Sequence, residues 1–431
     1  MSGAWAHGRF GAWRSVVRTG VLVGLLSSLI GSSRLLSAQT IAITGGTVFP
    51  VSGPKIEHGT VLIRDGKIVQ VGVGIAVPAG AQVIDATGKW VTPGLFHGGT
   101  TLGLVEVGSI SDTRENVQSG DINASFNVAE GLNPAATTIP VARMEGVTTA
   151  FVAPTDGLIG GQGVIIGLAG DRIEDLIRVS PAALVMSFGQ EGRDAGGGSR
   201  SGELAKIRQL FTDALEYDRR RADYGRNAMR PLAAPPADLD VLVQALQGKL
   251  LVVALADRKS DIESALRVGR EFHLRLILAG GAEGWMMAPQ LAAAGVPVLV
   301  QNMRDVPRWD ALNARLDNAT ILRQAGVNVV IAQNDDGRDR DLRWSAGNAV
   351  RNGMTWEDAL RAITLAPAQA FNVADRMGSL EAGKIADVVV WSADPLDFAS
   401  TAEHVLIGGQ EVPLTSRMVE LRERYRHLPP N

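Results

Sequence analysis

The 431-residue sequence contains no cysteine, which excludes disulfide bonds, thiolate nucleophiles and every cysteine-ligated zinc or iron–sulfur site. Histidine is also scarce, with six residues in the whole chain. A metal ion would therefore have to be held by histidine, aspartate, glutamate or a modified lysine. Aromatic residues make up only 5% of the chain, whereas 45% hydrophobic and 20% charged residues are typical of a globular protein and exclude a disordered one.

The N-terminal segment is typical of an export signal. Arg9, Arg14 and Arg18 precede an apolar run of about 15 residues that ends near Ala38. Because a membrane-spanning helix needs roughly 20 apolar residues, we expect cleavage near Ala38 and a periplasmic or secreted protein, with an uncleaved anchor as the minor alternative. Removing residues 1–38 deletes four arginines and no acid, so the net charge changes from −3 to −7. Such a charge disfavours nucleic acid as a partner.

Short β-type runs with turn signals occupy both ends of the remaining chain. Asp65-Gly66 lies between alternating apolar segments, which is a strong hairpin signal, and residues 386–391 and 405–407 repeat this style. The middle of the chain alternates buried-strand patterns with helical ones, and the predicted strands are 147–152, 250–254, 274–278, 296–300 and 327–331. This α/β alternation predicts a TIM-like (β/α)8 barrel with a small composite β-sandwich formed by both ends of the chain.

The composition shifts along the chain predict four parts. They are a signal peptide over residues 1–38, the N-terminal part of the sandwich over 39–93, the barrel over 94–377, and the C-terminal part of the sandwich with a tail over 378–431. Within the barrel, residues 189–238 have the least regular pattern. We expect them to form an insertion over the barrel mouth together with a solvated helix that carries Arg219 to Arg221.

Several motifs give a more specific signal than composition does. They are GGTV at 45–48, VLIRDGKI at 61–68, VTPGL at 91–95, GGQG at 160–163, AITLAPA at 362–368 and GSLEAGKIAD at 378–387. In this order they resemble the metal-dependent amidohydrolase superfamily, particularly its imidazolonepropionase-like branch, over nearly all of the chain after residue 38. The last two motifs together are the most specific part of the resemblance.

The resemblance implies hydrolysis of C–N bonds by one or two divalent metals at the C-terminal mouth of the barrel. The family's ligands are two histidines of an H-x-H on strand 1, commonly a carboxylated lysine on strand 4, one histidine each on strands 5 and 6, and an aspartate on strand 8. The metal activates water and the aspartate takes a proton. In this chain the matching positions hold Gly99, Thr101, Gly167, Leu255, Gly280 and Asn334. A one-residue shift on strand 8 would restore an acid, Asp335.

The positions of the six histidines lead to the same conclusion without any alignment. Only His97 lies where it can reach the barrel mouth. The others fall in the signal peptide, the sandwich segments, a helix-to-strand approach and the tail, at His7, His58, His404, His273 and His427. A four-histidine binuclear site is therefore excluded in one chain, and we expect no bound metal and no cofactor.

Three residues remain as candidates for a rebuilt catalytic site: His97, Asp335 and Asp336. His97 precedes a Gly-Gly pair and is a candidate general base, although a hydrogen-bonded structural histidine is the favoured interpretation. Asp335 and Asp336 follow a predicted strand as a candidate acid/base pair. Adjacent residues in a strand point to opposite faces, so a polar loop is favoured.

Two further segments allow a binding interpretation beside a structural one. Residues 160–163 are interpreted as a plain turn in preference to an anion-binding loop, because the spacing does not match a phosphate loop. Trp285, Met286 and Met287 are equally suited to a ligand cleft or to packing.

The sequence therefore predicts an amidohydrolase-family protein, by resemblance a hydrolase of cyclic-amide C–N bonds, whose usual metal ligands are missing. We expect a catalytically impaired homologue or a partner subunit in a hetero-oligomer with an active amidohydrolase paralogue. Two alternatives stay open. One is an active amidohydrolase with a site rebuilt around His97, Asp335 and Asp336, and the other is a module that binds a small-molecule ligand without chemistry.

Overall fold

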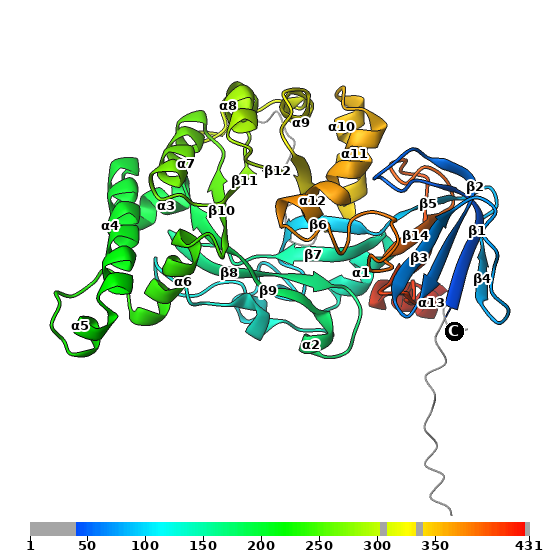
Figure 1. The fold of residues 1–431 in the computed structure, drawn as a ribbon, viewed down its shortest axis with the longest axis horizontal. Coiled ribbons are helices and arrows are strands. Elements are labelled where there is room, and N and C mark those ends of the chain that lie inside the picture. Colours follow the sequence, from blue (N-terminus) through cyan, green and yellow to red (C-terminus); the bar gives the residue numbers. More distant parts are fainter. Residues whose placement is uncertain (1–39, 302–307, 333–338, 427–431) are drawn as a thin grey trace, which may run out of the picture. The chain divides into compact units, whose positions relative to one another are not determined.

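Two eight-stranded sheets organise the chain (Figure 1). The computed structural model describes residues 40–301, 308–332 and 339–426. The predicted signal peptide and its cleavage site near Ala38 lie outside the described residues, as does the predicted tail beyond residue 426. No helix among the described residues is both long enough and apolar enough to span a membrane.

The first sheet combines strands from both ends of the chain. Its order is β16-β15-β14-β5-β1-β2-β3, and β4 pairs with β1 beside this path. Strand β5 from the N-terminal part therefore lies between β1 and the C-terminal strand β14. The strand bounds are β1 Thr40–Val48, β2 Ile56–Arg64, β3 Lys67–Gly72, β4 Gln82–Asp85, β5 Trp90–Pro93, β14 Val388–Trp391, β15 Ala402–Ile407 and β16 Gln410–Glu411. The strands that we expected in a sandwich thus form one hydrogen-bonded sheet.

The predicted hairpin at Asp65-Gly66 is present between β2 and β3. Arg64 pairs with Lys67 across a two-residue turn, and both turn residues have positive φ, 50° at Asp65 and 76° at Gly66. This is the backbone that Asp-Gly favours, because it matches the twist of the flanking strands.

The second sheet is the barrel, with the order β6 to β13. Its strands are β6 Leu95–Thr100, β7 Val147–Val152, β8 Ile159–Gly167, β9 Ile177–Ser187, β10 Leu251–Ala256, β11 Leu276–Gly280, β12 Val298–Gln301 and β13 Val329–Ala332. Strand β13 contacts β6, so the sheet nearly closes on itself. The five strands predicted from apolar runs are confirmed. One departure from a parallel (β/α)8 pattern is β8, which runs antiparallel to both β7 and β9.

The helices surround the barrel or continue from it. They are α1 Thr138–Met144, α2 Ile173–Leu176, α3 Gln190–Ala195, α4 Arg200–Arg219, α5 Arg221–Gly225, α6 Pro236–Leu246, α7 Lys259–Glu271, α8 Ala288–Ala293, α9 Asn318–Gln324, α10 Leu342–Arg351, α11 Trp356–Ala362, α12 Leu365–Ala370 and α13 Arg417–Arg426. Four short 3-10 turns are η1 Ser111–Thr113, η2 Val128–Gly131, η3 Gly284–Met287 and η4 Asp339–Asp341.

The segment 189–238 is more regular than its sequence indicated. Its longest helix, α4, buries Ile207, Leu210 and Phe211 and packs against α6. The Phe211 and Phe272 rings lie 5.0 Å apart, which also joins α4 to the end of α7. The helix therefore belongs to the outer layer of the barrel, and its charged residues conceal an apolar face.

The barrel interior is a packed apolar core. Every strand contributes a side chain to it: Phe96, Phe151, Ile165, Val185, Val253, Ile277, Leu299 and Val330. Phe371, which follows α12, closes one end with its ring 4.4 Å from that of Phe151. A filled interior is the normal state of this fold and leaves the strand ends to carry function.

A buried ion pair joins the two sheets. Arg178 of β9 donates two hydrogen bonds to Asp387, and the Asp387 carboxylate also accepts from Thr149 and from the backbone N–H of Gly408. Asp387 is the last residue of the GSLEAGKIAD motif. The motif thus has a structural task in holding the C-terminal strands against the barrel.

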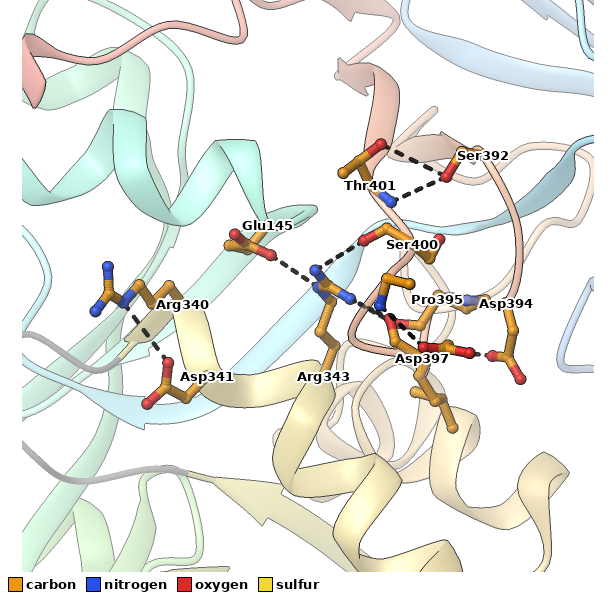
Figure 2. Close-up of polar contacts among 12 residues, drawn as sticks. Glu145, Arg340, Asp341, Arg343, Ser392, Asp394, Pro395, Asp397, Ser400 and Thr401 are labelled. Carbon is orange, nitrogen blue, oxygen red and sulfur yellow. Dashed lines mark hydrogen bonds and ion pairs between the residues drawn. The ribbon is translucent and has the colours of Figure 1, made fainter. Parts of the chain in front are cut away.

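A second buried arginine does the same on another side (Figure 2). The Arg343 side chain in α10 is 3% exposed and donates to the Glu145 carboxylate at 2.8 Å. Its other nitrogens donate to the carbonyl oxygens of Pro395, Asp397 and Ser400, as Figure 2 shows. One side chain therefore connects α10 and the end of α1 to the loop between β14 and β15.

Candidate functional site

A small cavity lies at the C-terminal ends of the barrel strands, where sites in this fold are built. Its volume is about 40 Å3. The lining residues are Gly98, Gly99, Thr100, Thr101, Phe151, Ala153, Pro154, Thr155, Val185, Val253, Leu255, Ala279, Leu299 and Gln301. Among the residues that the structure describes, no charged side chain and no histidine lines it. This volume is far below the 300–1,000 Å3 of ordinary ligand pockets and suits about one or two waters.

Three of the predicted ligand positions line this cavity: Gly99, Thr101 and Leu255. A Cβ built on Gly99 would meet only the Gln301 amide nitrogen, at 3.4 Å. Gly99 therefore faces space that a larger side chain could enter. Leu255 occupies the strand-5 position with an aliphatic side chain that offers no lone pair to a metal.

Gly167 lies elsewhere, and its interpretation as a strand-4 position is corrected. It ends β8, the third barrel strand, and pairs with Thr149 near the start of β7, away from the mouth. A Cβ here would lie 2.4 Å from the guanidinium nitrogen Nε of Arg178. Gly167 is thus required by the buried arginine. The fourth strand is β9, and its cavity-lining residue is Val185.

The local structure also explains why residue 280 is a glycine. It ends β11 with φ of 90°, a region that favours glycine, and a Cβ there would lie 2.6 Å from the Asp257 carboxylate. The β11 residue that faces the cavity is Ala279. The expected strand-6 position, Gly280, is one residue beyond the residue that faces the cavity. The apolar run alone does not define which of its residues points inward.

His97 is fully buried in β6 but is not among the residues that line the cavity. Its Nδ1 accepts a hydrogen bond from the backbone N–H of Gly99 at 3.3 Å. Burial lowers the pKa of His97 from 6.5 to about 3, so the imidazole is neutral at physiological pH. These features fit a structural histidine that fixes the β6 strand end.

Some predicted residues cannot be placed. Asn334, Asp335 and Asp336 lie outside the described residues, and so do His7 and His427. Of the other histidines, His58 and His273 are exposed, and His404 lies 2.6 Å from Glu411 in the first sheet. Within the described part of the chain, no cluster of three or more histidine, aspartate or glutamate side chains has a geometry suited to a metal ion.

Acidic residues do follow the barrel strands, but they serve neighbouring backbone groups. Asp257, after β10, accepts from the Ala282 N–H at 3.1 Å and from Arg308 at 2.8 Å. Glu283, after β11, accepts from the N–H groups of Lys259 and Asn313. Since their oxygens are occupied, these carboxylates stabilise the loops around the mouth.

One buried acid near β9 is less well satisfied. Glu203 of α4 is 2% exposed, and its Oε1 has no hydrogen-bond partner among the described residues. Burial, with a further contribution from Asp261, raises the pKa of Glu203 to about 8. No sequence pattern singled out this residue, because it lies in a segment that was expected to be irregular.

The residues after β11 pack on a loop and do not line a cleft. Trp285 donates from its indole nitrogen to the Asn313 carbonyl at 2.8 Å, and Arg315 lies 4.9 Å above its ring. Met287 is buried. The GGQG segment at 160–163, expected to be a turn, lies inside strand β8 and is buried throughout. Neither segment therefore forms a ligand site in the described structure.

The donor set at the mouth does not fit the family's metal centre. Threonine hydroxyls and one amide are weak ligands compared with imidazole and carboxylate, and the facing side chains Leu255, Leu299 and Val185 are apolar. The described residues at the mouth therefore do not hold the metal that the family uses.

Comparisons with known proteins agree with this fold. A family model described as "Amidohydrolase family" matches residues 288–413. The chain is 26% identical to an imidazolonepropionase of Acidiphilium cryptum over 79% of this chain and 89% of that protein. It is 23% identical to amidohydrolase tasK of Hapsidospora irregularis over 81% of this chain but only 39% of the larger relative.

Among solved structures, an amidohydrolase from Thermotoga maritima matches with a TM-score of 0.80 and 29% identity, over 88% of this chain and 100% of that one. The barrel, the sheet built from both chain ends and these matches support one class of protein: the chain has the fold of the amidohydrolase superfamily and resembles its members in sequence. Several of the relatives that match over most of this chain are imidazolonepropionases, so its similarity within that superfamily is to the imidazolonepropionase-like branch.

Proposed function

We propose that this protein is a catalytically impaired amidohydrolase homologue. The observation that carries the proposal is the lining of the mouth, where Gly99, Thr101 and Leu255 stand at ligand positions around a cavity of about 40 Å3. If the polar side chains of a metal site were kept without the metal, they would be buried without partners and would lower the stability of the fold. Small and apolar residues at these positions remove that cost.

The size of the rate effect that a metal supplies by activating water supports the proposal. A metal of the zinc type lowers the pKa of bound water from 15.7 to about 7, which corresponds to about 12 kcal/mol of stabilisation of hydroxide. Not all of this appears in the rate, because a less basic hydroxide is a poorer nucleophile. Losing half of it would still slow the reaction by more than about 10,000-fold.

The alternative of a rebuilt site is weaker. His97 is completely buried, its Nδ1 is engaged by the Gly99 N–H, and it does not line the cavity. A general base must come within hydrogen-bond reach of the proton it removes. A partner for His97 among Asp335 and Asp336 would have to come from outside the described residues.

Metal content and hydrolysis test the proposal together. The purified protein, incubated separately with Zn2+, Mn2+ and Fe2+ and then desalted, is expected to retain far less than one equivalent of metal by elemental analysis. It is expected not to hydrolyse imidazolone propionate or simple cyclic amides. Stoichiometric metal with chelator-sensitive hydrolysis would overturn the proposal. Hydrolysis without metal that is lost in His97→Ala, with the fold retained, would establish the rebuilt site instead.

We further propose that the protein is exported and acts as the partner subunit of an active amidohydrolase. Support comes from the segment 308–317, where Trp309, Leu312 and Leu316 are 90%, 55% and 39% exposed. Large apolar side chains gathered on a surface are typical of contact sites between proteins. Cleavage near Ala38 is tested by the N-terminal sequence of the exported protein.

Co-purification tests the partner role. The natural chain is expected to retain an amidohydrolase that has an intact H-x-H motif, and Trp309→Ser is expected to lose it. Val83→Ser, which changes another exposed apolar side chain on the first sheet, is the control and is expected to keep the partner. Recovery of the chain without such a paralogue would contradict the role. A shift of the thermal unfolding midpoint by cyclic amides or small peptides would favour a ligand-binding module.

A further inference from the structure

A larger groove lies at the end of the barrel opposite to the mouth. Leu251 begins β10, Leu276 begins β11 and Pro297 precedes β12, and all three line it, so it opens at the N-terminal ends of these strands. The ends of α7, α8 and α12 and the residues that follow them complete its walls. Its volume of about 400 Å3 is ten times that of the mouth cavity and lies in the range of small-molecule sites.

The charged groups in this groove are of one sign. Arg270 and Arg275 line it together with the amide residues Gln369 and Asn372, and none of the lining residues is an acid. Arg275 donates one hydrogen bond to the Gly248 carbonyl at 3.1 Å. The Arg270 side chain has no hydrogen bond or ion pair with any residue that the structure describes. Two guanidinium groups therefore retain donors for a ligand.

The remaining wall is apolar. Leu266, Leu274 and Val296 line the groove and are each less than 10% exposed. Their side chains belong to the barrel's outer core and give the wall a fixed shape. The groove thus offers cationic groups beside a rigid hydrocarbon surface.

Helix capping explains only part of this arrangement. Arg270 lies in the last turn of α7, where a cation is favoured by the helix dipole. Arg275 lies beyond that helix, directly before β11, so the dipole of α7 does not account for it. Capping also does not require a cavity of this size or the absence of a carboxylate counter-ion.

We propose that this groove binds a small organic anion that has a carboxylate head and an apolar body. The guanidinium groups of Arg270 and Arg275 bind the carboxylate, because their planar donor sets match its oxygens. The apolar body lies against Leu266, Leu274 and Val296. The site is separate from the barrel mouth and does not depend on the proposed loss of catalysis.

Calorimetric titration of the full chain with octanoate tests this proposal, and octanamide serves as the uncharged analogue of the same length. Octanoate is expected to bind at least about tenfold more tightly than octanamide and than butyrate, which shares the head but has a short body. Arg270→Gln and Arg275→Gln are each expected to weaken octanoate binding by about tenfold or more.

The matched control is Arg267→Gln. Arg267 is exposed on the same helix, donates to Ser264 and does not line the groove, so its loss is expected to leave octanoate binding unchanged. Both groove arginines are exposed, and circular dichroism confirms that the variants fold. The proposal is overturned if octanoate does not bind, if octanamide or butyrate binds equally well, or if Arg270→Gln binds as the natural chain does.

Discussion

The glycines at the end of β6 differ in what surrounds their α-carbons. A Cβ on Gly98 would lie 2.5 Å from Cγ1 of Val330 inside the packed barrel, whereas a Cβ on Gly99 faces the cavity and stays 3.4 Å from Gln301. Neither residue has positive φ, so the backbone accepts alanine at both. Packing alone therefore distinguishes them.

We predict that Gly98→Ala lowers the free energy of unfolding by about 1–3 kcal/mol, since Val330 is held by its neighbours and cannot move aside freely. Gly99→Ala is its matched control and is expected to change the free energy by less than about 1 kcal/mol. Urea unfolding followed by tryptophan fluorescence measures both. Equal effects of the two substitutions would show that the cavity does not exist in solution.

Glu203 gives the protein a defined pH dependence. In the folded chain its pKa is about 8, against the usual 4.5, because burial and Asp261 disfavour the charge. Between these pH values the folded protein holds a proton that the unfolded chain releases. The contribution of Glu203 to the free energy of unfolding is therefore fully present below about pH 4.5 and is lost as the pH rises to about 8, by up to about 1.4 kcal/mol per pH unit.

Glu203→Gln is predicted to flatten this slope, because glutamine resembles the protonated acid and does not titrate. The variant is expected to match the natural chain near pH 5 and to be more stable at pH 8. Urea unfolding at pH 5, 6, 7 and 8 measures the difference. Glu130→Gln, at an exposed position, is the control and is expected to keep the natural slope. Parallel profiles for the natural chain and Glu203→Gln would contradict the argument.

At the scale of elements, single buried arginines join segments that are far apart in the sequence. Arg343 serves one carboxylate and three carbonyl groups from its place in α10. A lysine has three donors on one nitrogen and cannot satisfy acceptors spread around a planar guanidinium. The contact between α10 and the β14–β15 loop therefore depends on the identity of this side chain.

We predict that Arg343→Met lowers the free energy of unfolding by about 3–5 kcal/mol, because it leaves the partly buried Glu145 carboxylate and three carbonyl oxygens without their donor. Arg340, one turn earlier, is 52% exposed and lies 3.6 Å from Asp341, so Arg340→Met is expected to cost less than about 1 kcal/mol (Figure 2). Denaturant titration compares the two variants. A loss at Arg343 no larger than at Arg340 would contradict a structural role for this contact.

The sequence predicted where strands lie along the chain better than it predicted which residues surround them in the fold. The run 147–152 became β7 with the same bounds, because an uncharged run rich in β-branched residues favours a buried strand. The antiparallel direction of β8 and its place as the third barrel strand were not predicted. Its glycines make close contacts with Phe126 and Phe151, and no local sequence pattern reveals these contacts. Likewise Gly167 and Gly280 were interpreted as former ligand positions, although Arg178 and Asp257 explain them. Such causes lie in residues distant along the chain.

At the scale of the whole molecule, apolar packing and buried polar contacts stabilise the part of the chain that the structure describes. The barrel interior is apolar, the Arg178–Asp387 ion pair joins the two sheets, and the Trp391 indole donates to Thr92 between β14 and β5 of the first sheet. The family motifs therefore predicted the architecture, because they stabilise it through residues such as Asp387. Substrate and partner are not encoded in those motifs, since a scaffold is retained when the site it carries has changed.

We predict that extensive dialysis against EDTA leaves the thermal unfolding midpoint and the circular dichroism spectrum unchanged. A structural metal bound to the folded state would add stability that a chelator removes. An imidazolonepropionase with its ligands intact is the comparison protein. A clear fall in the midpoint after dialysis, reversed by Zn2+, would contradict the metal-free architecture.

The position of β5 between β1 and β14 has a consequence for how the chain matures. Trp391 and its hydrogen-bond partner Thr92 are 299 residues apart, and strands that begin the polypeptide pair with strands near its end. A ribosome that works from the first residue to the last releases β5 long before its neighbour exists. Until β14 is synthesised, β5 has one edge without a hydrogen-bonded neighbour. An unpaired strand edge favours aggregation, so we expect this protein to be most vulnerable to aggregation and proteolysis during its synthesis.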